Sequence, residues 1–208
     1  MIKHAHGHAS VAMAPVLVIN EIREDIDMDH FSGNPKTEWL PDPGRADRDM
    51  KLLEDFSYTD PAGRVWMAPA GSIVNGASIP RALWSSVGSP YTDDYRNASV
   101  VHDIACDTTS IPRKDADEMF YYACITGGCS KRQAALLYAG VRIGAWSSSH
   151  RAYEPDHRKL LLYRLPGKKT DNEITIQSKY VEIANQLEQL GDEPDFDAVD
   201  RVVEAGLR

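Results

Sequence analysis

Residues 100–128, VVHDIACDTTSIPRKDADEMFYYACITGG, hold the strongest structural pattern in this chain and decide the fold that it predicts. The first part belongs to a helix expected over about Asp94–Asp107. A second helix is expected to start at Ser110, with Pro112 in its first turn, and to stop at Gly127-Gly128. Its apolar residues recur at helical spacing: Ala116, Met119, Phe120, Ala123 and Cys124. An antiparallel pair of these helices is expected at the centre of the fold.

Around this pair, the sequence predicts a core domain over residues 49–150. Two strands, Lys51–Tyr58 and Arg64–Ala68, flank the turn TDPAG and would form a hairpin. The loop GSIVNGASIPRALW, residues 71–84, leads into a short helix that ends near Gly88. A third long helix opens with the capping-box residues Ser130–Gln133 and turns Ala134, Leu137, Val141 and Ala145 inward. The predicted fold class is α+β: a small antiparallel sheet packed with a helical core, followed by a C-terminal helical extension.

The flanking segments differ in character from the core. Residues 1–48 form a loop-rich N-terminal segment with one predicted strand at Val16–Asn20. Residues 151–208 comprise a linker and an acidic extension with helices at about Ile174–Leu190 and Phe196–Ala205. The first of these helices has one apolar face: Ile176, Tyr180, Ile183, Ala184 and Leu187. That face is expected to dock on the core, which is the commoner outcome, or on a second copy or a protein partner.

The composition limits the kinds of partner. The 208 residues include 31 Asp and Glu against 23 Lys and Arg, so the formal net charge is −8. This charge argues against nucleic acid, because phosphate neutralisation needs clustered basic residues. No apolar run reaches the roughly 20 residues that span a bilayer, and Pro15 breaks the N-terminal apolar stretch, so neither an integral membrane protein nor a secretory signal is expected. An odd, sparse set of cysteines predicts free thiols and a reducing compartment such as the bacterial cytoplasm: Cys106, Cys124 and Cys129.

The candidate catalytic residues lie on the central helix pair. His102 is expected at the rim of the core, and Asp103 points about 100° away from it. In an antiparallel pair, Asp117 would accept a hydrogen bond from the His102 ring, fix its tautomer and raise the basicity of the other ring nitrogen. Asp103 would bind a divalent cation, with calcium the candidate cofactor, or hold the loop that contains Asn75. The structural alternative is a helix-surface or capping feature without catalysis.

Two candidate nucleophiles each have a structural alternative. Ser78 would be the nucleophile of a Ser78–His102–Asp117 triad, but a serine in an A-S-I-P turn is more often the N-cap of the following helix. Cys106 lies four residues after His102 and would form a thiolate–imidazole pair. The commoner role of such a cysteine is that of a small buried residue.

Candidate binding residues flank these motifs. Arg81 and Arg113 would bind an anionic group of a substrate, or else form ion pairs with Asp103 or Asp117. Trp84 and Trp146 would line an apolar substrate groove, although large aromatic side chains at helix ends usually mark the edge of a core. Alternating histidines near the N-terminus would share one face of a strand and bind a transition metal, although a terminus without fixed structure is more common: His4, His6 and His8.

The ordered motifs NGASIPRALW, VVHDIAC and RKDADEMFYYA resemble a phage- and prophage-encoded family of unknown function. Its signature is roughly T-D-G-A-S-I-P-R…W, then HD, then R-x-x-A-D-x-x-F, and the resemblance covers about Val65–Gly144. The family's recurring positions correspond to Ala77, Ser78, Pro80, Arg81, Trp84, His102, Asp103, Arg113, Asp117 and Phe120. Asn75 departs from the usual Asp of the family, so a metal that relies on that carboxylate would be held more weakly. The resemblance supports a site and implies no particular reaction.

VVHDIAC with DADEMF is also similar, more weakly, to the helix pair of bacterial phospholipase A2. In that family the His of the HD pair activates water, the adjacent Asp binds calcium and a second Asp orients the His. The resemblance would give these roles to His102, Asp103 and Asp117. This chain departs from the family in its cysteine positions, in the shorter gap between motifs and in lacking a clear glycine-rich calcium loop just upstream.

The function expected from these observations is hydrolysis of an ester or amide bond, with His102 as general base on water and Asp117 orienting it. The phage association favours a lipid or peptidoglycan substrate in the bacterial envelope, or a toxin delivered to another cell. The main alternative is a non-catalytic phage or prophage interaction module. In that case, His102, Asp103 and Asp117 form a buried polar network that ties the helices together.

Overall fold

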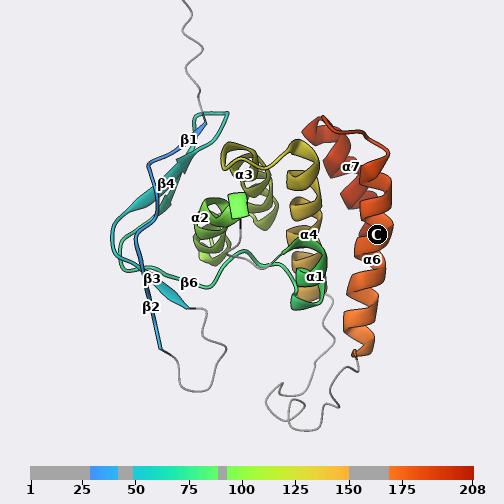
Figure 1. Ribbon diagram of the computed structural model, residues 1–208, viewed down its shortest axis with the longest axis horizontal. Helices are drawn as coiled ribbons and strands as arrows, with labels where there is room; N and C mark the ends of the chain where they lie inside the picture. Colours follow the sequence, from blue (N-terminus) through green and yellow to red (C-terminus); the bar gives the residue numbers. More distant parts are fainter. Residues whose placement is uncertain (1–28, 42–48, 89–92, 150–168) are drawn as a thin grey trace, which may run out of the picture.

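The structure is a computed structural model that describes residues 29–41, 49–88, 93–149 and 169–208. Two small antiparallel sheets lie on one side of a group of helices (Figure 1), so the α+β class predicted from the sequence is confirmed. The strand predicted at Val16–Asn20 and the histidines at positions 4, 6 and 8 lie outside the described residues. No helix in the described part of the chain combines the length and hydropathy needed to cross a membrane.

The first sheet contains the predicted hairpin. Strand β4 (Phe56–Thr59) pairs antiparallel with β5 (Val65–Ala68), and β1 (His30–Phe31) pairs with the other edge of β4. The turn between β4 and β5 is held by Asp60, whose Oδ1 accepts hydrogen bonds from the amides of Ala62 and Arg64. Short polar side chains favour such turns because they satisfy the backbone locally.

The second sheet shows that the predicted strand Lys51–Tyr58 is wrong in its extent. Strand β3 (Met50–Leu52) pairs with β2 (Thr37–Trp39) and β6 (Ile73–Val74), whereas β4 belongs to the other sheet. The chain bends at residues 53–55. Asp55 stabilises the bend, since its Oδ1 accepts a hydrogen bond from the Ala70 amide at 2.7 Å. A side chain that bonds to the backbone in this way competes with continuation of the strand.

The helices follow the order predicted from their apolar spacing. A 3-10 turn, Arg81–Leu83, runs into α1 (Trp84–Val87), and a second, Asp93–Tyr95, runs into α2 (Arg96–Asp107). The next helices are α3 (Arg113–Thr126) and α4 (Lys131–Ser149), followed by α6 (Asp171–Glu188) and α7 (Phe196–Gly206). Helix α3 starts later than expected, because Pro112 has extended backbone angles and occupies the N-cap rather than the first turn. One half of the predicted capping box is present before α4, where Ser130 Oγ accepts the Gln133 amide.

The helices pack in successive layers away from the sheets (Figure 1). Helix α2 packs against β5 and α3, α3 packs against α4, and α4 packs against α6. The pairing of α2 with α3 is antiparallel: the start of α2 meets the end of α3, where a Cβ on Gly127 would overlap the Asp94 carbonyl. Large side chains with 2% exposure or less fill the space between these layers: Tyr58, Tyr95, Phe120, Tyr121 and Tyr138.

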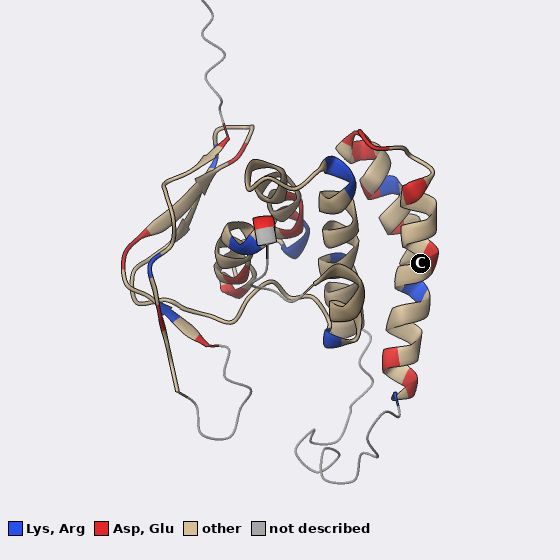
Figure 2. Cartoon of the chain, viewed as in Figure 1, with Lys and Arg blue, Asp and Glu red and all other residues tan. Residues whose placement is uncertain are grey.

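The C-terminal extension docks on the core of its own chain, the commoner of the predicted outcomes. The apolar face of α6 is buried through Ile176, Tyr180, Ile183 and Leu187. Acidic residues at the C-terminal end of α6 and before α7 lie near basic residues that begin α4 (Figure 2). These pairs are exposed, as in Arg132 with Glu188, so the apolar contacts contribute most of the docking energy.

The loop before α1 lies directly on α4. The Ser78 carbonyl oxygen occupies the space where a Cβ of Gly144 would stand, so the loop backbone approaches the helix more closely than an alanine would allow. At Gly140, one turn earlier, a Cβ would meet the Ile79 side chain at an ordinary 3.5 Å. The close approach fixes the position of the loop that also contacts the candidate site.

We predict that Gly144→Ala lowers the free energy of unfolding by about 1–3 kcal/mol, because the added methyl group must displace backbone. Gly140→Ala is the matched control on the same helix. It should be neutral or raise that free energy by up to about 1 kcal/mol, since alanine favours a helix over glycine. Urea denaturation of both variants measures the difference, and equal effects would contradict the proposed contact.

Candidate functional site

His102 lies on α2 but is fully buried, with 0% of the residue exposed. The sequence predicted a position at the rim of the core, and the structure corrects this. The Phe120 ring on α3 packs against the imidazole at a centroid distance of 4.7 Å, so the apolar stripe of α3 forms one wall around the ring. Phe120 contacts His102 because both residues lie on the buried faces of their helices, α3 and α2.

Asp117 on α3 faces His102, as the antiparallel pairing predicted. Its Oδ1 lies 2.7 Å from His102 Nε2, and it also accepts a hydrogen bond from Arg113 Nε at 2.9 Å. The other oxygen, Oδ2, accepts from Arg142 Nη1 on α4 at 3.2 Å. The carboxylate is fully buried, and its hydrogen-bonding capacity is met by three side chains. It joins α2, α3 and α4 at one point.

These contacts fix the charges of the pair. Burial by itself would raise the pKa of Asp117, but the His102 hydrogen bond and the Arg113 guanidinium hold it below its ordinary value, so the carboxylate is ionised. Burial lowers the pKa of His102 below 6.5, against the opposing effect of Asp117. Because two guanidinium groups already compensate Asp117, the imidazole is neutral near pH 7. The proton on Nε2 then faces Asp117, and Nδ1 has an acceptor lone pair, with the Cys106 sulfur 3.8 Å away.

Cys106 lies between the imidazole and the surface. Its Sγ is 3.4 Å from His102 Nε2 and 3.8 Å from Nδ1, one helical turn further along α2. Burial raises the pKa of the thiol to about 12, although Arg113 acts in the opposite direction. The sulfur is therefore a thiol near pH 7, which disfavours the predicted thiolate–imidazole pair. Cys106, Cys124 and Cys129 form no disulfide within the described part of the chain.

Asp103 holds the loop, one of the two roles predicted for it. Its Oδ2 accepts a hydrogen bond from the Asn75 backbone amide at 2.6 Å. The contact uses the backbone of Asn75, so it does not depend on that side chain. It places the loop before α1 beside α2, on a different side of the helix from Asp117.

Asp103 belongs to no group of three or more His, Cys, Asp or Glu side chains within the described part of the chain. Calcium takes six to eight oxygen ligands. Among the described residues, the one group of three or more His, Cys, Asp or Glu side chains is His102, Cys106 and Asp117, whose ligand atoms lie within 4.8 Å of one another. Asp103 is not in that group, and Arg113 and Arg142 place two positive charges beside it. We therefore assign no chemical step to a cation here.

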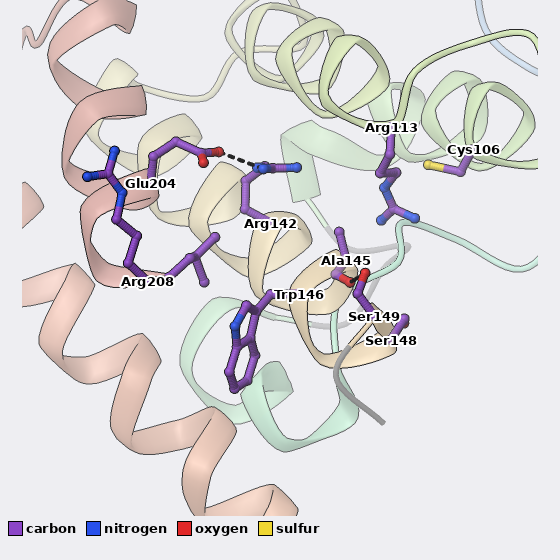
Figure 3. A pocket seen from close by; sticks show the side chains of 10 residues that line it. Cys106, Arg113, Arg142, Ala145, Trp146, Ser148, Ser149, Glu204 and Arg208 are labelled. Atoms are coloured by element: carbon purple, nitrogen blue, oxygen red, sulfur yellow. Dashed lines mark hydrogen bonds and ion pairs between the residues drawn. The ribbon is translucent and has the colours of Figure 1, made fainter. Parts of the chain in front are cut away.

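A pocket of about 520 Å³ opens beside the buried pair (Figure 3). Of the residues predicted to act in binding or catalysis, it brings together Cys106, Arg113 and Trp146. The remaining lining residues come from α4 and from the C-terminal segment: Arg142, Ala145, Ser148, Ser149, Glu204, Leu207 and Arg208. Arg142 connects the two groups, because it donates to Asp117 and, at 2.6 Å, to Glu204.

Sequence reasoning missed Arg142, although a signal was present. It is the one charged residue in the run AALLYAGVRIGAW, residues 134–146. A charged side chain on the buried face of a helix needs a partner, so its position implied a buried counter-charge. Glu204 and Arg208 had no such local signal, because their contacts depend on how α7 docks.

Several other predicted residues lie away from this pocket. Ser78 presents its carbonyl to Gly144 and is not the predicted N-cap, since Pro80 occupies that position without a side-chain bond. Arg81 lies over the Trp84 ring, with 5.3 Å from its Cζ to the ring centroid. Trp84 Nε1 donates to the Ile79 carbonyl. Arg113, by contrast, lines the pocket and also forms the ion pair with Asp117 that was the alternative to substrate binding.

Comparison with known proteins finds similarity to uncharacterised proteins. Residues 50–141 match a family described as "Protein of unknown function (DUF1353)". "Uncharacterized protein y4jT" of Sinorhizobium fredii is 41% identical over 112 residues, which are 53% of this chain and 32% of that protein. "Uncharacterized protein y4iH" of the same organism is 33% identical over 133 residues, 64% of this chain and 54% of that protein. The chain thus spans about a third to a half of these relatives. No solved structure matches it.

We predict that Asp117→Asn lowers the free energy of unfolding by about 3–5 kcal/mol, because it removes the counter-charge of two largely buried arginines. Asp115→Asn on the same helix is the control. Asp115 is half-exposed and lies 3.9 Å from Arg64, so its loss should cost less than about 1 kcal/mol. Chemical denaturation of both variants tests this, and a small effect at Asp117 would show that its ion pairs do not support the fold.

We also predict a loss of stability on acidification. Because the pKa of His102 is lowered in the folded protein, the unfolded chain binds a proton that the folded chain does not at pH values just below 6.5. The free energy of unfolding should therefore fall as the pH drops through this range. His102→Gln should remove this part of the pH dependence. Denaturation curves at pH 7.5 and 5.5 measure it, and identical pH dependence in both proteins would contradict a neutral His102.

Proposed function

We propose that this protein is a hydrolase of an ester or amide bond, with His102 as general base and Asp117 as its orienting carboxylate. The observation that supports the proposal is the 2.7 Å contact between His102 Nε2 and Asp117 Oδ1. It directs the ring proton to the buried side and leaves Nδ1 as the basic atom. The neutral state of His102 near pH 7 is the state that a general base requires.

In this mechanism, Nδ1 accepts a proton from a water molecule as that water attacks the carbonyl carbon of the substrate. The imidazolium that forms donates to Asp117, which is ionised and fixed in position by Arg113 and Arg142. As the tetrahedral intermediate collapses, the imidazolium gives its Nδ1 proton to the leaving alcohol or amine, so the ester or amide bond breaks and His102 is again neutral. Arg113 also lines the pocket, where it would stabilise negative charge on the carbonyl oxygen in the transition state.

Access to Nδ1 depends on Cys106. Its sulfur is 3.8 Å from Nδ1, and the residue lines the pocket, whereas His102 has no exposed surface. A water molecule therefore reaches the imidazole only if the Cys106 side chain rotates aside. In the proposed mechanism, Cys106 controls access and is not the nucleophile, in keeping with the raised pKa of its thiol.

The substrate class and setting proposed here rest on the resemblance to phage- and prophage-encoded proteins and to phospholipase A2. A lipid or a peptidoglycan component of the bacterial envelope would be the substrate, and action on another cell would make the protein a toxin. The contact of Asp103 with Asn75 gives Asp103 a loop-holding role, so the proposal includes no calcium-dependent step.

A second candidate function is a non-catalytic interaction or structural module of a phage or prophage. The observation that favours it is the complete burial of His102 and Asp117. Such a network specifies how helices pack and needs no substrate. The two functions differ at His102 Nδ1: catalysis requires this atom to accept a proton, whereas the structural network does not use it.

We predict that His102→Gln abolishes activity while the protein remains folded. A glutamine amide can replace Nε2–H as the donor to Asp117, but it cannot accept a proton at neutral pH. Activity is measured on p-nitrophenyl esters of several chain lengths and as growth arrest on expression in bacterial cytoplasm or periplasm, and folding by thermal unfolding. Full activity in this variant would exclude His102 as the base. Absence of any activity in the unmodified protein across these assays would favour the interaction module.

Cys106→Ala distinguishes water attack from attack by the thiol. It removes the sulfur between the imidazole and the pocket, so the variant should retain activity or gain it. Loss of activity in a folded Cys106→Ala protein would instead identify Cys106 as the nucleophile.

A further inference from the structure

We propose that the pocket beside the buried pair binds an oxyanion, a phosphate or carboxylate group of a ligand with an apolar part, between Arg113 and Arg142. This ligand would be the substrate of the proposed hydrolysis, and only that assignment rests on the proposed function. Binding itself requires no catalysis. The argument combines unpartnered donors, local charge and the apolar wall of the pocket.

The first observation concerns guanidinium groups that lack acceptors. Arg113 Nη2 and Arg142 Nε are buried and donate to no atom of the residues that the structure describes. Arg113 uses Nε on Asp117, which leaves its terminal nitrogens for another acceptor. In Figure 3 the Arg142 side chain extends toward Arg113, so the two groups face a common space. Buried donors without acceptors are costly, and an oxyanion would supply acceptors to both after a small side-chain movement.

The second observation is a local excess of positive charge in an acidic protein. Three arginines line the pocket, against one acidic residue, Glu204, while Asp117 lies behind Arg113 and Arg142. Arg208 is exposed, and in Figure 3 its side chain extends away from Arg113, so the two arginines at the centre of the proposed site are Arg113 and Arg142. The chain as a whole has a formal charge of −8, so this concentration of arginine does not reflect the general surface.

The third observation is the size and chemistry of the rest of the pocket. Its volume of about 520 Å³ exceeds that of a bare oxyanion and lies in the usual range for small-molecule sites. Trp146, Ala145 and Leu207 provide apolar surface next to the arginines. The ligand that fits this arrangement has an anionic group at Arg113 and Arg142 and an apolar group against Trp146.

Glu204 gives the site an internal competitor. Its carboxylate accepts a hydrogen bond from Arg142 Nη2 at 2.6 Å, so it occupies one nitrogen of the guanidinium that would bind the ligand. A ligand oxyanion must displace this contact or share the guanidinium with it. Removal of the Glu204 charge should therefore strengthen binding, an effect that a purely structural ion pair would not produce.

Calorimetric titration of the full chain with phenyl phosphate, benzoate and inorganic phosphate tests the proposal. At least one of the two aromatic anions should bind saturably and more tightly than inorganic phosphate. Arg113→Lys keeps the charge but removes the terminal nitrogens, and should raise the Kd about tenfold, as expected for one charge-assisted hydrogen bond. Glu204→Gln should lower the Kd. Arg201→Gln, an exposed arginine on α7 outside the pocket, is the control and should leave it unchanged.

Vesicles separate a lipid headgroup from a soluble ligand. Co-sedimentation with phosphatidylcholine vesicles that contain phosphatidylglycerol, weakened by Arg113→Lys, would assign the oxyanion to a lipid. Two results would overturn the proposal. One is that neither aromatic anion binds saturably and that Arg113→Lys leaves vesicle binding unchanged. The other is that the parent, Arg113→Lys and Glu204→Gln proteins bind with equal Kd values. His102→Gln should bind with the parent affinity, so loss of hydrolysis alone would count against the proposed reaction and not against the pocket.

Discussion

The buried carboxylate of Asp117 is the constraint on which the rest of this structure depends. A charge without solvent must be compensated by donors in fixed places, and here these donors come from His102 on α2, Arg113 on α3 and Arg142 on α4. Arg142 extends the network to α7 through Glu204. Four helices are thus positioned by one acidic side chain. Buried ion pairs often add little net stability, but they penalise any packing that leaves a charge unpaired.

The same network determines the chemistry available at the site. Compensation by two arginines allows His102 to remain neutral, so its ring donates to Asp117 through Nε2 and has an acceptor lone pair at Nδ1, the atom that would be the base in the proposed reaction. Structural and catalytic roles are therefore compatible in one residue, and burial alone does not decide between them. What would distinguish the two is access to Nδ1 from the pocket, where Cys106 lies in the lining with its sulfur 3.8 Å from that atom.

Local pattern predicted much of the fold and the centre of the site. The apolar spacing of α3 and the HD pair on α2 were sufficient to place Asp117 opposite His102, because helix geometry is regular over such short separations. The break between β3 and β4 was missed, since Asp55 bends the chain through a bond to the distant Ala70. The pocket was also missed, because Glu204 and Arg208 reach it only through the docking of α7. Contacts between distant segments leave little trace in local periodicity.

The residues that line the pocket come from two separate parts of the chain. Cys106 and Arg113 lie within residues 50–141, which match the family of unknown function, whereas its other eight lining residues lie at positions 142–208. His102 and Asp117 thus lie within the matched stretch, and most of the pocket lining lies outside it. Under the proposed function, substitutions in the second stretch would change the lining of the pocket and leave the His102–Asp117 pair in place.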